Sequence, residues 1–342
     1  MSLDRPTMED VAARAGVSRA LVSIVFRDAP GASESTRRRV LLSAAELGYQ
    51  PDRRASRLGR SRTRMIGVVF GLGHDFHAEV IDGIYAAADD HGYEVVLSGV
   101  TTRRSEASAV RAVLAERCEG AVLVGPRLPT REIAELAGRV PTVVLLRHLR
   151  IRSVDAVRTD EMAGMQQLVD HLAGLGHERI LHVDGGSAAG AAQRRQAYRA
   201  AMGGRGLEAR WVAGGPTEEA GAAAAAMVLD RTTGARPTSI AAFNDRCALG
   251  VLHQLLRGGL EVPADVSLTG FDDITAAGFG HIELTTVRQD ADRLGRLALE
   301  RLRHRLEDGR APLPPFLVPP ALVVRRTTAA PERPRRRQPP RT

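Results

Sequence analysis

The sequence contains no lysine, only two cysteines and few aromatic residues. All 48 of its basic residues are arginines, and aromatic residues make up 4% of the chain. Cys118 and Cys247 lie far apart, which favours two small buried side chains over a disulfide or a metal site. No apolar run approaches the roughly 18 residues of a membrane span, and Asp4, Glu9 and Asp10 interrupt any signal peptide at the N-terminus. We therefore expect a cytoplasmic protein without a metal or a cofactor.

Positive charge is concentrated at the two ends of the chain. Residues 1–64 carry 13 arginines against 7 acidic residues, and residues 325–342 carry 7 arginines against one acidic residue. Since the formal net charge is +8, the middle of the chain is mildly acidic. A basic segment attached to a mildly acidic body is typical of a protein in which one domain binds a polyanion and the rest has another function. The same numbers of arginines and acidic residues would be found if the uneven charge served only to keep the protein hydrated.

The first fifty residues have the pattern of a helix-turn-helix. Thr7 can cap a first helix, with Asp10 reaching back to complete a capping box, and Gly16 can end that helix in the left-handed conformation. Ser18 can cap a second helix, and Ser33 a third. Two short helices joined by a tight glycine turn are typical of DNA-binding domains. The second helix should expose Arg19, Ala20, Ser23 and Ile24, available to enter a major groove.

A basic stretch, DRRASRLGRSRTR, follows at residues 52–64. Its main apolar residues are Ala55 and Leu58. One interpretation is a short helix that orders on DNA and inserts an apolar side chain into the minor groove. The other is a flexible basic linker.

From Met65 onward, strand-like and helix-like segments alternate. Buried strands are predicted at 65–70, 93–98, 120–125 and 141–146, and in a second series after residue 160 at 179–185, 211–212, 239–243 and 266–271. Helices fill the intervals, so the pattern predicts parallel sheets covered by helices, in two lobes. Ligands in this architecture bind at the carboxyl ends of the strands, which here would lie between the lobes.

A dinucleotide-dependent enzyme is the main catalytic alternative. Such an enzyme needs G-x-G-x-x-G after its first strand, whereas Gly71 and Gly73 are followed by Phe76 instead of a third glycine. The sequence has no Walker loop, nucleophile-elbow serine or zinc-binding helix motif. We therefore expect that the chain is not an enzyme.

The motifs together resemble those of the LacI (lac repressor/purine repressor) family of transcriptional regulators. The matching stretches are TMEDVAARAGVS (7–18), LVS (21–23), STRRRV (35–40), ELGYQP (46–51), GHERI (176–180), FND (243–245), VPADVSLTGFDD (262–273) and LTTVRQD (284–290). The resemblance implies an all-α helix-turn-helix N-terminal domain at 1–50 and a hinge helix or linker at 51–64. It also implies an α/β two-lobed, periplasmic-binding-protein-like effector domain with parallel sheets at 65–327.

By this resemblance the chain crosses between the lobes three times. Lobe 1 would span about 65–158 and 289–312, and lobe 2 about 159–288 and 313–327. A helix over Ala291–Asp308 would return to the first lobe, and a strand over Phe316–Val324 would belong to the second. Residues 328–342 are rich in arginine and proline and are expected to be disordered; they lack the leucine heptads of a tetramerisation tail.

The resemblance implies specific contacts with double-stranded DNA. Arg19 and Ala20 fall at the main base-reading positions, where an arginine can bind guanine and a methyl group can contact thymine. Leu58 would enter the minor groove beside the same residue of a second subunit. The implied contacts are Thr7, Ser18, Arg19, Ala20, Ser23, Ile24, Ser33, Thr36, Arg37, Ala55 and Leu58. Ile24 stands where the family usually has arginine and removes a polar base contact, so the resemblance implies DNA binding without fixing the operator sequence.

Effector contacts are implied in the body. They are Phe76, Arg147, Arg194, Asn244 and Asp272. Asn244 and Asp272 follow strands, where helix capping or turn formation is an equal alternative. Pro216 and Leu146 replace residues usual in the family, and the first-lobe loop carries His74 and His77. Two histidines alone do not make a metal site.

These features predict a sequence-specific transcriptional regulator, by family default a repressor. It would bind a palindromic operator as a homodimer, under the control of a carbohydrate or related metabolite held between the lobes. A regulator that has lost small-molecule control is the alternative. A sugar-binding protein or a Rossmann-type enzyme is less favoured, because a transported binding protein needs a signal peptide and has no helix-turn-helix.

Overall fold

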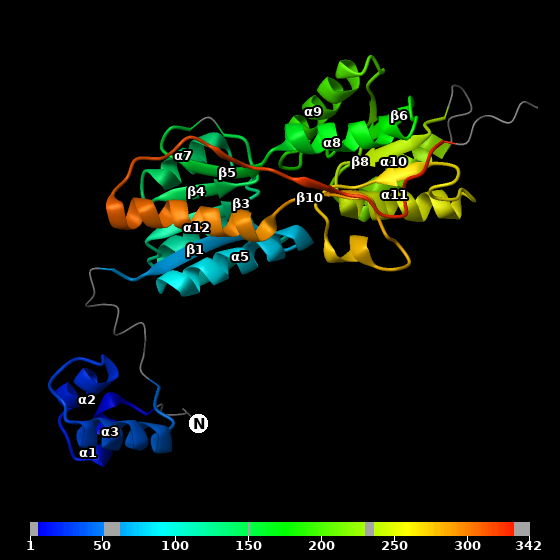
Figure 1. Cartoon of the computed structure of the whole chain (residues 1–342). Coiled ribbons are helices and arrows are strands. Elements are labelled where there is room, and N and C mark those ends of the chain that lie inside the picture. Colours follow the sequence, from blue (N-terminus) through cyan, green and yellow to red (C-terminus); the bar gives the residue numbers. More distant parts are fainter. Residues whose placement is uncertain (1–5, 51–61, 150, 230–235, 332–342) are drawn as a thin grey trace, which may run out of the picture. The chain divides into compact units, whose positions relative to one another are not determined.

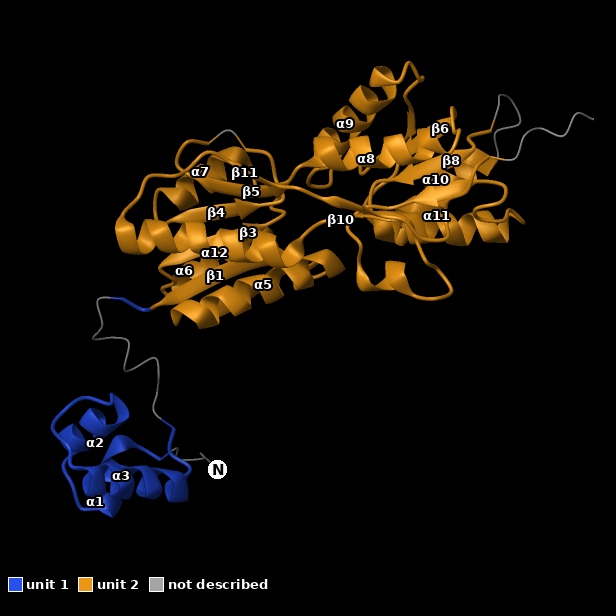
Figure 2. Cartoon of the chain, in the orientation of Figure 1, with its two compact units in different colours: residues 1–63 blue, residues 64–342 orange. Residues whose placement is uncertain are grey.

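The computed structural model describes residues 6–50, 62–149, 151–229 and 236–331. The chain forms two compact units, residues 1–63 and residues 64–342 (Figure 2). Among the described residues, no helix combines the length and the apolar composition that a membrane crossing requires.

The described part of the first unit contains three helices: α1 (Met8–Ala15), α2 (Arg19–Phe26) and α3 (Glu34–Leu47) (Figure 1). The capping box is confirmed, because Thr7 accepts the Asp10 backbone N–H while the Asp10 carboxylate accepts the Thr7 N–H. Gly16 ends α1 at a φ of 65°, in the left-handed region that glycine adopts without strain. Ser18 and Ser33 cap α2 and α3 as predicted.

The core of the first unit takes one fully buried valine from each helix, Val11, Val22 and Val40. At its margin the rings of Phe26 and Tyr49 pack with centroids 5.5 Å apart. This small core leaves the polar start of α2 on the surface.

The second unit begins with a parallel sheet of six strands in the order β11-β5-β4-β3-β1-β2. The strands are β1 (Met65–Gly71), β2 (Glu94–Val100), β3 (Gly120–Val124), β4 (Thr142–Leu145), β5 (Asp155–Thr159) and β11 (Phe316–Val318). The helices are α5 (Asp75–His91), α6 (Glu106–Ala115), α7 (Thr130–Ala137) and α12 (Ala291–Asp308). Helices α5 and α12 cover one face of the sheet, and α6 and α7 cover the other. We call this sheet with its helices the first lobe.

A second parallel sheet has four strands in the order β7-β6-β8-β9, beside an antiparallel pair, β10-β12. The strands are β6 (Ile180–Val183), β7 (Arg210–Val212), β8 (Ser239–Ala242), β9 (Ser267–Thr269), β10 (Thr286–Arg288) and β12 (Ala321–Val323). The helices are α8 (Glu161–Gly174), α9 (Ala191–Gly204), α10 (Glu218–Leu229), α11 (Asp245–Arg257) and the 3-10 turn η1 (Thr275–Gly278). Helices α10 and α11 cover one face, and α8 and α9 the other. This is the second lobe.

The prediction of one strand over Phe316–Val324 in the second lobe is wrong. Residues 316–318 form β11, which pairs with β5 in the first sheet, whereas residues 321–323 form β12, which pairs with β10. Pro319 and Pro320 separate the two strands because a proline has no N–H group for a strand ladder. The third crossing between the lobes therefore follows Val318 rather than residue 312. The other two follow β5 and β10, and all three segments run between the lobes in Figure 1.

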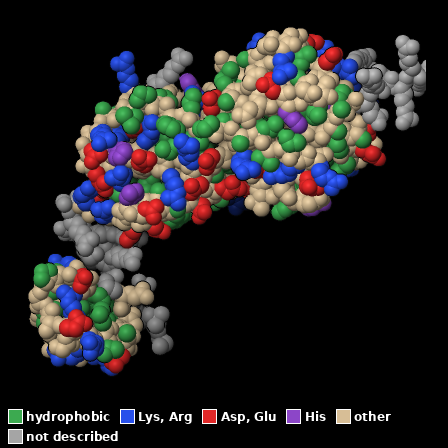
Figure 3. Space-filling view, in the orientation of Figure 1, with side chains coloured by type: hydrophobic (Ala, Val, Ile, Leu, Met, Phe, Trp, Pro, Cys, Tyr) green, Lys and Arg blue, Asp and Glu red, His purple; other side chains and the backbone are tan. Residues whose placement is uncertain are grey.

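Charged side chains of both signs are mixed over the second unit. On the face seen in Figure 3, arginines and acidic residues alternate across both lobes. Many are joined in ion pairs, such as Arg296 with Asp90 and Asp292. This mixture agrees with the mildly acidic composition predicted for the middle of the chain.

Candidate functional site

The exposed start of α2 is the first candidate surface. Arg19 and Ala20 are exposed in its first turn, whereas Ser23 and Ile24 are half-buried. The Nε atom of Arg19 lies 2.9 Å from Oε1 of Glu9 on α1, and these two side chains are 69% and 63% exposed. Because this contact uses Nε, it leaves the two terminal amino groups of the guanidinium for another partner.

Four of the predicted DNA contacts lie at helix N-termini. The hydroxyls of Thr7, Ser18 and Ser33 accept backbone N–H groups at the starts of α1, α2 and α3. The Thr36 hydroxyl lies 2.9 Å from that of Ser33. Helix N-termini favour anions because their free N–H groups and dipoles point outward, so these positions suit phosphates.

Arg37 is engaged within the first unit. Its guanidinium donates to Asp28 Oδ1 at 2.6 Å and to the backbone carbonyl of Ala29, and its side chain is only 19% exposed. These bonds fix the loop after α2. A phosphate contact by Arg37 stays a prediction, and Ala55 and Leu58 lie outside the described residues.

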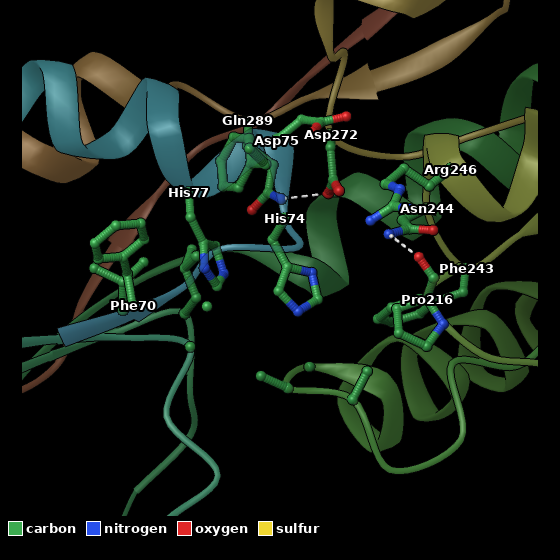
Figure 4. Close-up of a pocket in the computed structure, with 18 of the residues that line it drawn as sticks. Phe70, His74, Asp75, His77, Pro216, Phe243, Asn244, Arg246, Asp272 and Gln289 are labelled. Atoms are coloured by element: carbon green, nitrogen blue, oxygen red, sulfur yellow. Dashed lines mark hydrogen bonds between the residues drawn. The ribbon is translucent and has the colours of Figure 1, made fainter. Parts of the chain in front are cut away.

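A cavity of about 170 Å³ lies between the two lobes (Figure 4). It is lined by residues that follow β1, β3 and β4 in the first lobe and β6, β7, β8 and β9 in the second. The cavity therefore lies at the carboxyl ends of the strands, where the ligand site was expected. Four of the five predicted effector contacts line it: Phe76, Arg194, Asn244 and Asp272.

Arg147 is not among the lining residues. Its guanidinium donates instead to the backbone carbonyls of Pro126 and Leu128. The neighbouring Leu146 lines the cavity, with a φ of 61°. The chain turns sharply after β4, and this turn directs the Arg147 side chain towards the 126–128 loop.

Arg194 and Asp272 form a buried ion pair on the second-lobe side. Arg194 Nη2 donates to Asp272 Oδ1 at 3.3 Å, and Nη1 donates to the Phe243 carbonyl at 2.8 Å. The guanidinium carbon lies 3.8 Å from the centre of the Phe271 ring. The buried Nε of Arg194 has no hydrogen-bond partner. A ligand in the cavity could supply the missing acceptor.

Asp272 has an unusual backbone conformation and several partners. Its φ is 119°, a region that side-chain-bearing residues rarely adopt. Gln289, which follows β10, donates to Asp272 Oδ1 at 2.6 Å. Burial raises the pKa of Asp272, against the opposing effect of the Arg194 charge. Held in this way, the carboxylate faces the cavity in Figure 4.

Asp245 supports the loop that carries Asp272. Asp245 Oδ2 accepts the Ile274 N–H at 2.9 Å, and Oδ1 accepts the Thr286 hydroxyl at 2.6 Å. Asp245 is fully buried, and this burial raises its pKa well above the ordinary value. These contacts hold the loop in place from within the second lobe.

Asn244 caps a helix and lines the cavity. Its Oδ1 accepts the Cys247 N–H at 2.9 Å, which begins α11, and its Nδ2 donates to the Pro216 carbonyl at 3.3 Å. The capping alternative is thereby confirmed. One amide hydrogen remains for a ligand, so an effector contact by Asn244 stays a prediction.

Two histidines form part of the first-lobe wall. The rings of His74 and His77 lie with centroids 4.6 Å apart. Burial lowers the pKa of His77 to about 3, and burial followed by the charge of Arg246 lowers that of His74. Both rings are therefore neutral near pH 7, and they offer hydrogen-bonding edges without charge.

Sequence reasoning missed most of the polar residues of the cavity, among them Glu161, Arg246 and Gln289. Each of these three follows a strand or begins a helix, but only the meeting of the lobes brings them to one place. The signal that could have found Arg246 is its position directly after the FND motif, at the carboxyl end of a strand.

Two protein families match this chain. Residues 7–52 match the family described as bacterial regulatory proteins, lacI family, and residues 169–328 match the periplasmic binding protein-like domain. The HTH-type transcriptional repressor PurR of Vibrio campbellii is 32% identical over 333 residues, which cover 94% of this chain and 98% of that protein.

Solved structures of transcriptional regulators are also similar to this chain. A LacI transcriptional regulator from a Rhodococcus species is 43% identical, with a TM-score of 0.75, and the match covers 78% of this chain and 98% of that one. The lac repressor dimer bound to operator and the anti-inducer ONPF is 28% identical, with a TM-score of 0.82. That match covers 96% of this chain and 100% of the other.

Proposed function

Since this chain belongs to the LacI family of bacterial regulatory proteins, we propose that it is a homodimeric repressor whose operator binding is controlled by a small molecule. It is a DNA-binding transcriptional regulator. In this proposal the protein catalyses no reaction and acts in the cytoplasm, where the chromosome is found.

The observation that carries the proposal is the exposed start of α2. Arg19 and Ala20 stand on the surface of a short helix with no acidic residue in its first turn. A helix of this kind fits the major groove, where arginine binds the O6 and N7 atoms of guanine. We propose that these two residues read bases, and that Thr7, Ser18, Ser33 and Thr36 contact phosphates.

A dimer is proposed because one small domain makes too few contacts for tight specific binding. The similar lac repressor structure is a dimer bound to operator. Two copies related by a twofold axis would read a palindrome, or nearly one.

The cavity between the lobes is the proposed effector site. Its guanidinium groups on the second-lobe side already have carboxylate partners, since Arg194 pairs with Asp272 and Arg246 with Glu218. On the opposite side the flat rings of His74 and His77 are uncharged, and the charged residues there, Asp75, Glu106 and Arg127, include both signs. These walls suit a neutral, ring-shaped molecule with several hydroxyl groups, and we propose a carbohydrate or a related metabolite.

The test of the DNA-binding proposal is selection of DNA from a random library by the full-length protein. We expect a palindromic sequence to be enriched, and Arg19→Ala to lose that enrichment while still binding DNA. Failure of the wild-type protein to enrich any sequence would overturn the proposal.

A thermal-shift screen with sugars and nucleosides tests the effector proposal. A ligand at about 100-fold above its dissociation constant adds roughly 2.7 kcal/mol to the free energy of unfolding. The stabilising compound should also change the affinity for the selected DNA, by about 5- to 150-fold. A compound that stabilises the protein and leaves DNA affinity unchanged would refute control through the cavity.

A further inference from the structure

Arg246 joins the two lobes at the edge of the cavity. It lies in the first turn of α11, in the second lobe, and its Nη1 donates to the backbone carbonyl of Gly73. Gly73 belongs to the first lobe, in the loop between β1 and α5. Arg246 Nε and Nη2 donate to the two carboxylate oxygens of Glu218, at 2.8 and 2.5 Å. One guanidinium thus binds a carboxylate of its own lobe and a carbonyl of the other.

Helix packing places Glu218 beside Arg246. Glu218 begins α10, which crosses α11 at two glycines. A Cβ atom on Gly250 would lie 1.9 Å from the Glu218 carbonyl oxygen, and one on Gly221 would lie 2.0 Å from that of Cys247. Only glycine permits so close an approach. The position of the Glu218 backbone beside α11 therefore follows from the packing of the two helices.

The ion pair is partly shielded from water. The side chains of Arg246 and Glu218 are 23% and 39% exposed. Their mutual hydrogen bonds lower the pKa of Glu218 and raise that of Arg246, so both are charged near neutral pH. A two-pronged guanidinium–carboxylate contact also fixes the plane of the guanidinium, and with it the direction of Nη1.

The loop bound by Arg246 carries a wall of the cavity. His74 follows Gly73 directly and lines the cavity, and Figure 4 labels His74 and Arg246 at different sides of it. The lobes also approach each other elsewhere on the cavity wall. There Gly125 of the first lobe lies close to Ala189 of the second, since a Cβ atom built on Gly125 would lie 3.9 Å from the Ala189 Cβ. A second polar link beside the cavity comes from Gln289, which follows the crossing after β10 and donates to Asp272 of the second lobe.

We infer that Arg246 and Glu218 form a clasp that holds first-lobe residues 71–77, which comprise the end of β1, the loop after it and the start of α5, against the second lobe. The clasp consists of protein atoms alone, so it positions the His74 wall independently of any bound molecule. Arg246 is thus a positioning residue for the cavity. The inference rests on the proposed function in one respect, because it treats the cavity as an effector site.

Hydrogen–deuterium exchange of the full-length protein, without added ligand, tests the clasp. In Arg246→Ala we expect exchange over residues 71–78 to rise about tenfold, the effect of losing one water-screened, charge-assisted hydrogen bond. Glu218→Gln should raise it several-fold, because the guanidinium loses its charged partner. The control is Arg205→Ala, which removes an arginine from the Arg205–Asp170 pair, 39% and 41% exposed, on the surface of the second lobe. It should leave the loop unchanged.

Unchanged exchange at residues 71–78 in a folded Arg246→Ala protein would overturn the clasp. So would an increase spread evenly over the second lobe, which would make Arg246 a stabiliser of that lobe alone. If Arg246→Ala does not fold, Glu218→Gln decides by the same two criteria. Failure of the proposed regulatory function would instead appear as a lack of sequence-specific DNA binding by the wild type. That result has no bearing on the exchange of this loop.

Discussion

Arg19 and Glu9 are joined across two helices of the first unit, with Nε of the arginine 2.9 Å from Oε1 of the glutamate. The arginine begins α2 and the glutamate lies in the first turn of α1. A carboxylate behind the guanidinium restricts its orientation and leaves the terminal amino groups facing away from it. The helix-turn-helix thus presents an oriented arginine where a base-reading residue is proposed.

Replacing Arg19 with alanine should reduce discrimination between DNA sequences. An arginine that binds guanine through two hydrogen bonds contributes about 1–3 kcal/mol of discrimination, or roughly 5- to 150-fold. We therefore expect affinity for the selected operator to fall by this factor relative to random DNA. Both affinities should be measured by fluorescence anisotropy at one fixed salt concentration. An equal loss for operator and random DNA would instead identify Arg19 as a phosphate contact.

Replacing Glu9 with glutamine should have two opposite effects. Affinity for random DNA should rise roughly two- to fivefold, because a negative charge near the phosphates is removed. Preference for guanine at the Arg19 position should fall, because the guanidinium loses its orienting partner. Both effects should be measured as binding affinities, for random DNA and for operator variants that carry each of the bases at that position.

Glu46→Gln is the matched control for this variant. Glu46 pairs with Arg14 at 2.7 Å in the same unit, and its side chain is 57% exposed against 63% for Glu9. The change in net charge is equal, so a general charge effect appears in both proteins. Loss of base preference in both variants, or in neither, would contradict the role of Glu9.

Local signals predicted local structure well. The caps of Thr7, Ser18 and Ser33 depend on atoms three residues apart, and all three are confirmed. The helix over Ala291–Asp308 is confirmed with its predicted bounds. Strand β5 was missed because its sequence, DAVRT, contains two charged residues and no apolar run. Its Asp155 is buried against Arg301 and Arg305, a compensation that a sequence pattern does not reveal.

The position of the cavity could be predicted from the sequence, but only some of the residues that line it could. Residues that follow strands were expected there, and Asn244 and Asp272 do line it. Arg147 also follows a strand, yet it turns away to bind two carbonyls. Arg246 acquires its contacts only when Glu218 and Gly73 approach from distant parts of the chain. Side-chain direction and contacts between lobes are tertiary properties, so the linear pattern leaves them open.

Replacing Asp272 with alanine should destabilise the second unit. Arg194 and Asp272 are only 8% and 11% exposed, and removing one partner leaves the other charge buried and uncompensated. Breaking such a pair costs about 3 kcal/mol. Urea unfolding followed by circular dichroism should show this loss, while DNA binding by the first unit persists at low denaturant.

Asp272→Asn separates the two contributions of this side chain. Asparagine keeps an oxygen that can accept from Gln289 and Arg194 but removes the charge, so the loss of stability should be smaller than for alanine. Response to the effector should be lost in both variants if the carboxylate contacts it. An alanine variant as stable as the wild type would contradict the buried-pair account.

The free energy of unfolding should fall in mild acid because of His182. This histidine lies in β6, fully buried, with its ring stacked on Tyr198 and its Nδ1–H donating to the Ala241 carbonyl. Burial lowers its pKa in the folded protein from the ordinary 6.5 to about 4. Between these values the unfolded chain binds more protons, so its contribution to stability is complete above pH 6.5 and is lost as the pH falls towards 4. The slope contributed by one such group is at most about 1.4 kcal/mol per pH unit.

His182→Phe should remove this part of the pH dependence. Phenylalanine keeps the ring beside Tyr198 but loses the hydrogen bond to Ala241, so the free energy of unfolding should be lower than that of the wild type at pH 7. The difference from the wild type should then shrink as the pH falls from 7 to 5, because only the wild type loses the histidine contribution. Urea titrations at pH 7, 6 and 5 give both quantities. His253→Gln, which changes an exposed histidine of α11, should keep the wild-type slope. A parallel pH dependence in the wild type and His182→Phe would show that His182 does not take up a proton on unfolding.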